Sequence, residues 1–169
     1  MISVVIPTFN SAATLAEAMA SLIPAAVDAL VREVVVADGG SSDDTFAIAD
    51  DAGAKFIQAG GDRAALIAAG CAAARGPWLL ILYPEIRLGS EWIAAAKAHL
   101  ADYPRRAAYF RLALDEHGAM ARLKEAGAAL FGRPGGEQGL LVPKALYQQG
   151  GARRSRPLPA RAFRIGPSL

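Results

Sequence analysis

Short apolar runs alternate with helical segments along most of this chain of 169 residues, and this alternation limits the possible folds more than any other feature. The apolar runs have the length and the Val, Ile and Leu content of buried strands; they are residues 3–7, 33–38, 55–58, 77–83, 107–114 and 139–143. Helical patterns separate them, at residues 11–23, 41–54, 61–76, 90–102 and 119–132. Strands and helices in this order form right-handed βαβ crossovers. The sequence therefore predicts an α/β fold, a single domain with a mostly parallel sheet and helices on both faces.

Residues with strong capping preferences mark the ends of two of these helices. Ser41 or Ser42 is expected to cap the helix within residues 41–54, and Gly53 to stop it. Asp62 is expected to cap the next helix, with Gly76 just past its end.

The composition is that of a compact protein, because 53% of the residues are hydrophobic and 20% are charged. No run reaches the ~18 apolar residues that a membrane span needs. The first ten residues lack the basic region and the cleavage site of a signal peptide, so we expect a cytoplasmic protein. The single cysteine, Cys71, excludes an internal disulfide and is expected to pack as a small hydrophobe.

The charge is distributed unevenly along the chain. All 16 acidic residues lie at or before Glu137, whereas six basic residues and no acid follow it. Residues 152–169 also contain three prolines, so we predict a basic tail there without a regular helix or a central strand. This tail is interpreted either as a solvated arm or as a contact for phosphate, lipid headgroups or a partner subunit. Nucleic acid is not favoured as a partner, because no aromatic interleaving accompanies the charge.

Polar and glycine-rich segments follow four of the predicted strands, where an open α/β sheet binds its ligands. They read PTFN at residues 7–10, ADGGSSDD at 37–44, AGGDR at 59–63 and YPEIRL at 83–88. Asp38 is a candidate to accept hydrogen bonds from a base or a ribose, and the two glycines after it let the backbone approach a ligand. The alternative is that Asp38, Ser41 and Asp43 only build a turn and a helix cap.

The segments VVIPTFN and VVVADGGSSDDT, at residues 4–10 and 34–45, together resemble the opening of family 2 glycosyltransferases, which have the GT-A fold of nucleotide-diphospho-sugar transferases. More narrowly, they resemble a bacterial subgroup with Asp-Gly-Gly-Ser in place of Asp-Asp-Gly-Ser. Residues 60–82, 85–96 and 136–151 continue the likeness in order and spacing. The resemblance implies a glycosyltransferase-like domain over residues 1–151, followed by the tail at 152–169.

The resemblance also implies a ligand and the residues that bind it. The ligand is a nucleoside diphosphate sugar, most often uridine-linked, held together with a divalent metal, Mn²⁺ or Mg²⁺. The metal ligand would be Glu85, at the end of the strand at residues 77–83. The nucleotide-binding residues implied are Pro7, Thr8, Asn10, Asp38, Gly39 and Arg63.

Two departures from the family pattern lie in the segments that hold the donor. Ala65 and Ala68 stand where the family usually has an Arg and an Asn. The metal-binding Asp-x-Asp, or His-Ala-Asp in the subgroup, is replaced by Tyr83, Pro84 and Glu85. Glu85 keeps a carboxylate but reaches one methylene further, which matters because hard cations need oxygen ligands at a tightly fixed distance.

A third departure concerns the general base. The family has a Glu-Asp pair after a Gly-Gly turn, but no acid follows Gly151 in this chain, and Glu137 is the only late carboxylate. Three interpretations stay open: a sugar transferase that uses Glu85 and an unusual base, a non-catalytic protein that binds a nucleotide or a partner, and a nucleotidyltransferase on a related fold. The acceptor is unknown, and a homodimer would cover the side of the site that this short chain leaves open.

Overall fold

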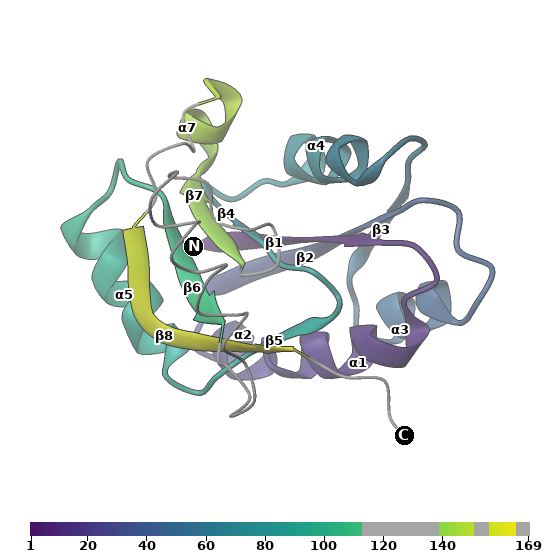
Figure 1. Ribbon diagram of the computed structural model, residues 1–169, viewed down its shortest axis with the longest axis horizontal. Helices are drawn as coiled ribbons and strands as arrows, with labels where there is room; N and C mark the ends of the chain where they lie inside the picture. The colour runs from purple at the N-terminus through teal and green to yellow at the C-terminus, as the bar shows by residue number, and fades with distance from the viewer. Residues whose placement is uncertain (113–138, 151–155, 165–169) are drawn as a thin grey trace, which may run out of the picture.

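The computed structural model describes residues 1–112, 139–150 and 156–164. Its centre is an eight-stranded sheet with the strand order β3-β2-β1-β4-β7-β6-β8-β5 (Figure 1). The strands are β1 (Ile2–Thr8), β2 (Val31–Asp38), β3 (Lys55–Gln58), β4 (Trp78–Ile81), β5 (Ile86–Leu88), β6 (Ala108–Leu112), β7 (Leu140–Pro143) and β8 (Arg156–Arg164). The helices are α1 (Ala12–Ala20), α2 (Ile23–Val27), α3 (Thr45–Asp51), α4 (Arg63–Ala73), α5 (Trp92–Asp102) and α7 (Lys144–Gln148). The helix predicted at 119–132 lies outside the described residues.

The first four strands of the chain form the parallel half of the sheet. β1 pairs in parallel with β2 on one side and with β4 on the other, and β3 extends the sheet beyond β2. In this register Thr8 lies beside Asp38, and Val5 lies beside Ile81. The carboxyl ends of these strands therefore meet at one edge of the sheet, which confirms the predicted α/β architecture.

Alternating side chains of the strands face two helical layers. On β1, Val4 and Ile6 are buried in one core together with Leu15 of α1 and Trp92 of α5, whereas Val5 is buried in the other. Cys71 of α4 belongs to that second core, as expected for a small hydrophobe. Figure 1 shows α4 and α7 on one side of the sheet and α1, α2, α3 and α5 on the other, which confirms helices on both faces.

The other half of the sheet has mixed strand directions and includes part of the basic tail. β7 is antiparallel to β4 and β6, and β8 lies between β6 and β5. The expectation of no central strand after residue 151 is therefore wrong. The prolines are tolerated because the β6–β8 register shifts between Tyr109, the partner of Pro157, and Arg111, the partner of Arg161. The division of the chain at residue 151 stays a prediction.

The structure confirms some of the predicted helix ends and corrects others. Asp62 is the N-cap of α4, and its carboxylate accepts a hydrogen bond from the backbone N–H of Ala65. Gly53 follows α3 with a positive φ of 68°, as its predicted stop requires. The predicted cap at Ser41 or Ser42 is wrong, since α3 begins only at Thr45. No helix among the described residues is long and apolar enough to cross a membrane.

Candidate functional site

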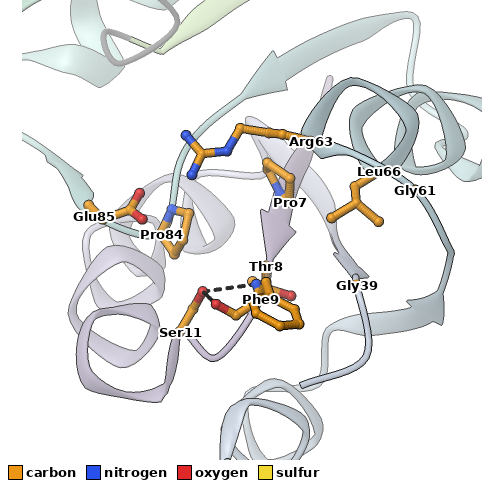
Figure 2. A pocket seen from close by; sticks show the side chains of 10 residues that line it. All are labelled: Pro7, Thr8, Phe9, Ser11, Gly39, Gly61, Arg63, Leu66, Pro84 and Glu85. Atoms are coloured by element: carbon orange, nitrogen blue, oxygen red, sulfur yellow. Dashed lines mark hydrogen bonds between the residues drawn. The ribbon is translucent and has the colours of Figure 1, made fainter. Parts of the chain in front are cut away.

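A cavity of about 390 Å³ lies at the carboxyl edge of the parallel strands (Figure 2). Its walls come from the ends of the strands β1, β2, β3 and β4 with the loops that follow them, and from the start of α4. The lining residues are Pro7, Thr8, Phe9, Ser11, Gly39, Gly61, Arg63, Leu66, Pro84 and Glu85. Its size is that of a pocket for a small organic ligand.

Side-chain hydrogen bonds tie the loop after β1 to the loop after β2. The Thr8 hydroxyl donates to Asp38 Oδ1 over 2.8 Å, and the backbone N–H of Asn10 donates to the Ser41 hydroxyl over 2.8 Å. Asn10 Oδ1 accepts from the backbone N–H of Ser42 over 2.9 Å. Asn10 has a positive φ of 49°, a conformation that asparagine tolerates better than most residues. Loops joined in this way hold one wall of the cavity in a fixed shape.

The same two loops are joined again where their helices begin. The backbone N–H of Ser11 donates to the Thr45 hydroxyl, and that of Ala12 donates to Asp43 Oδ2, both over 2.9 Å. Asp43 Oδ1 in turn accepts from the hydroxyl and the backbone N–H of Thr45. These hydrogen bonds lower the pKa of Asp43 from its ordinary value.

Asp38 is the centre of the loop network and is only 2% exposed. Besides Thr8, the Ser41 hydroxyl donates to Oδ1, and the backbone N–H groups of Gly40 and Ser41 donate to Oδ2. Burial alone would raise the pKa of Asp38, but these hydrogen bonds outweigh it, so the pKa is lower than usual. Asp38 is thus an ionised carboxylate whose oxygens accept hydrogen bonds from its own loop and from Thr8 of β1.

The structure brings five of the seven predicted site residues to the cavity wall: Pro7, Thr8, Gly39, Arg63 and Glu85. The side chains of Asn10 and Asp38 instead hold the loops behind that wall. Their predicted contact with a nucleotide stays a prediction. Sequence reasoning missed Phe9, whose ring is 63% exposed and lines the cavity. The available signal was an aromatic residue inside PTFN, a segment at a strand end where ligands bind.

Arg63 is the first residue of α4 and extends over the cavity toward the loop that carries Pro84 and Glu85 (Figure 2). Its guanidinium carbon lies 4.8 Å from the centre of the Tyr83 ring, within the range of a cation–π contact. Tyr83 follows β4 after a single buried residue, Leu82. The strand end therefore holds the cation at the mouth of the pocket.

Gly70 sets how closely α4 approaches the sheet. A Cβ atom at this position would lie 2.4 Å from Val5 Cγ1 and 3.3 Å from Ala37 Cβ. Glycine therefore permits the helix to pack against β1 and β2 at a distance that a larger residue would prevent. This packing positions Arg63 and Leu66, which line the cavity from the same helix.

The carboxylate of Glu85 is the only one that lines this cavity among the described residues. No group of three or more His, Cys, Asp or Glu residues gathers within the described ranges. A lone carboxylate beside a proline does not supply the several fixed oxygen ligands with which a protein holds Mn²⁺ or Mg²⁺. The predicted donor set thus does not fit a metal site built by the described residues.

A sheet with parallel strands and a pocket beyond their carboxyl ends, lined by both polar and apolar residues, defines an α/β protein with its candidate ligand site at that edge. Within that class, residues 3–113 match the sequence model described as glycosyl transferase family 2. The chain belongs to this family. No curated protein sequence matches it.

Solved structures with the same fold are glycosyltransferases of the GT-A type. Glucosyl-3-phosphoglycerate synthase from Mycobacterium tuberculosis, in complex with Mn²⁺ and uridine-diphosphate-glucose, has a TM-score of 0.70 at 17% identity, covering 100% of this chain and 71% of the synthase. S. aureus TarS 1-349 has a TM-score of 0.60 at 22% identity, covering 70% of this chain and 37% of TarS. Its complex with UDP-GlcNAc has a TM-score of 0.65 at 18% identity, covering 88% and 47%. The chain thus spans less than half of the TarS fragment.

Proposed function

We propose that this chain binds a nucleoside diphosphate sugar in the pocket at the carboxyl edge of its sheet. The observation that carries the proposal is that the loops after β1, β2 and β4 border one cavity together with Arg63. These are the loops to which the family resemblance assigns the donor nucleotide. Uridine-linked sugars are the first ligands to test, since the synthase and TarS were crystallised with them.

The lining residues supply the contacts that such a ligand needs. The exposed ring of Phe9 offers a flat apolar surface for a base. Gly39 leaves room beside Leu66 and Phe9, where a Cβ would already lie within 3.4 Å of both side chains. The guanidinium of Arg63 has the planar donor geometry that suits phosphate oxygens. The base and the diphosphate thus each have a complementary surface in this pocket.

Donor binding, and not transfer, is the function proposed. Transfer needs a general base within hydrogen-bond reach of the acceptor hydroxyl. Among the described residues that line the pocket, the one carboxylate is Glu85, and the resemblance places it beside the diphosphate. Glu137, the late carboxylate in the sequence, lies outside the described residues.

A thermal-shift screen with UDP, GDP, CDP, dTDP and their sugars, in Mn²⁺ and in EDTA, tests the proposal. At one hundred times its Kd a ligand stabilises the fold by about 2.7 kcal/mol. We therefore expect the matching nucleotide to raise Tm by roughly 5–10 °C. Gly39→Val should abolish this rise by filling the cavity, whereas Gly60→Val, at a site with nothing within 4 Å of a Cβ, should keep it. The proposal fails if no nucleotide raises Tm, or if Gly39→Val responds as the wild type does.

A further inference from the structure

A bound diphosphate brings two or more negative charges to the Pro84–Glu85 side of the pocket, and something must balance them. In the synthase complexes Mn²⁺ accompanies the uridine nucleotide. The described residues of this chain offer one carboxylate for such an ion, Glu85, and no cluster of metal ligands. They offer one cation that lines the same pocket, Arg63.

We propose that the guanidinium of Arg63 balances the charge of the diphosphate in this chain, so that nucleotide binding does not require a divalent metal. This inference rests on the proposed function, because it concerns the same nucleotide in the same pocket. It goes beyond that function by naming the group that holds the phosphates and by removing the metal from the binding step.

The contact between Arg63 and Tyr83 fixes the cation without using its hydrogen-bond donors. The guanidinium carbon lies over the Tyr83 ring, 4.8 Å from its centre, and a cation–π contact of this kind uses none of the five N–H groups as a hydrogen-bond donor to an oxygen. These N–H groups can therefore still donate to phosphate oxygens. Tyr83, which replaces the first acid of the family's metal motif, thus serves here as a platform for a cation.

No residue in the described part of the chain neutralises Arg63. The three ion pairs found there join Arg75 to Glu33, Arg87 to Glu17 and Lys97 to Asp28. Glu85 lines the same pocket as Arg63, yet no salt bridge joins them among the described residues. Within the described ranges the positive charge therefore lies over an aromatic ring and has no acidic partner, which is the arrangement expected of an anion-binding group.

Replacing Glu85 distinguishes best between a metal and Arg63 as the group that holds the diphosphate, because the two predict opposite changes in UDP affinity. If a metal ion bridges Glu85 and the diphosphate, removing the negative charge of Glu85 weakens binding. If Arg63 holds the diphosphate directly, the carboxylate only repels the ligand. The variant Glu85→Gln then strengthens binding.

The test is calorimetric titration of UDP into the full chain, in EDTA and in Mn²⁺, with uridine as the phosphate-free probe. We expect wild-type Kd values for UDP that agree within about threefold between the two buffers. Arg63→Ala should weaken UDP binding about 10- to 100-fold, as the loss of charged hydrogen bonds predicts, and leave uridine unchanged. Glu85→Gln should strengthen UDP binding in EDTA. If the nucleotide that shifts Tm in the screen carries another base, its diphosphate and nucleoside replace UDP and uridine.

Two further variants separate the role of Arg63 from a general change in charge. Arg63→Lys keeps the charge but lacks the fork and the flat face, so it should recover only part of the lost affinity. Arg32→Ala removes an exposed cation from the start of β2, at the opposite edge of the sheet, and should bind UDP as the wild type does. Arg63 is itself exposed, and an unchanged Tm for each variant confirms that the fold is kept.

Two results would overturn the inference, and they differ in what they say of the proposed function. The first is that UDP binds only in Mn²⁺, that Glu85→Gln abolishes this binding, and that Arg63→Ala binds UDP as tightly as Arg32→Ala does. This result would show that a metal holds the diphosphate. The proposed function would then stand without the inference. If the wild type binds no nucleotide in either buffer, both fall together.

Discussion

At the scale of single residues, Asp38 shows how the carboxylate of a family motif can be engaged by hydrogen bonds from its own loop and from the neighbouring strand. Its carboxylate accepts hydrogen bonds from Thr8, Gly40 and Ser41, and it is almost fully buried. These contacts join β1 to β2 at the edge where the pocket opens. Asp38 therefore shapes the pocket from behind its wall, whether or not a ligand atom also reaches it.

Replacing Asp38 with Asn is expected to destabilise the protein by about 1–3 kcal/mol at pH 7. The amide keeps only one acceptor oxygen, and its nitrogen cannot accept the hydrogen bonds that the second carboxylate oxygen accepts in the wild type. The pKa of Asp38 is lowered in the folded state. The stability that its ionised form contributes is therefore present above the ordinary aspartate pKa of about 3.9 and is lost as the pH falls through the lower, folded-state pKa. Urea unfolding at pH 7 and near pH 2 should show the wild-type advantage shrinking in acid. Asp44→Asn, at an exposed neighbour, serves as the control, and an equal loss there would contradict the argument.

At the scale of elements, α4 links the core to the pocket. Its N-terminal end carries Arg63 next to the Asp62 cap, and its middle is pressed against β1 through Gly70. Because Gly70 packs the helix against β1 and β2, the helix cannot shift without moving the guanidinium that it carries. The position of the proposed phosphate-binding group is thus set by packing seven residues away.

Gly70→Ala is expected to lower stability despite the better helix propensity of alanine. The added methyl would meet Val5 Cγ1 at 2.4 Å, and overpacking of a core costs about 1–3 kcal/mol, against at most about 1 kcal/mol gained in propensity. A lower midpoint of urea unfolding than that of the wild type would confirm it. Gly60→Ala, where the methyl meets nothing within 4 Å, should leave the midpoint close to that of the wild type. An unchanged midpoint in Gly70→Ala would mean that α4 moves away at little cost.

The elements also show what the sequence could and could not predict. Buried runs such as VVIP and WLLI identify their strands because their length and their content of Val, Ile and Leu both indicate a buried strand. The ends of these strands also located the loops that line the pocket. The sequence left open whether Asp38 binds a ligand or builds a turn, and its hydrogen bonds from Gly40 and Ser41 are those of a turn. The fourth hydrogen bond could not be predicted, since it depends on Thr8, thirty residues earlier, coming into register with Asp38. The sequence predicts the residues of β5 as part of a loop, because three residues are too few to show the periodicity of a strand. This strand forms through its pairing with β8.

At the scale of the whole molecule, the segment at Arg156–Arg164 is part of the sheet and not only a charged arm. It pairs with β6 in parallel and with β5 in antiparallel fashion, and Leu158 and Ala162 are buried in the larger core. Local composition predicted the opposite, because prolines and arginines argue against a strand until neighbouring strands accommodate them.

Leu158→Ala tests that placement. Leu158 is 3% exposed, so its truncation is expected to cost about 2–5 kcal/mol, measured by chemical unfolding of the full chain. Val27→Ala, at a side chain that is 81% exposed, is the matched control and should change stability by less than about 0.5 kcal/mol. If both substitutions lower the free energy of unfolding by a similar, small amount, the segment is a solvated arm and Leu158 is not part of the core.

The pairing of β5 with β8 also bears on the order in which the molecule assembles. Arg87 and Phe163 are partners in this ladder although most of the second half of the chain lies between them. Closing so long a loop lowers the conformational entropy of the chain before any contact between the two strands offsets this loss. Such pairings therefore form slowly. β5, which follows Glu85, thus depends on β8 for its pairing. We expect refolding chains to regain their helices before this pairing forms and completes the pocket.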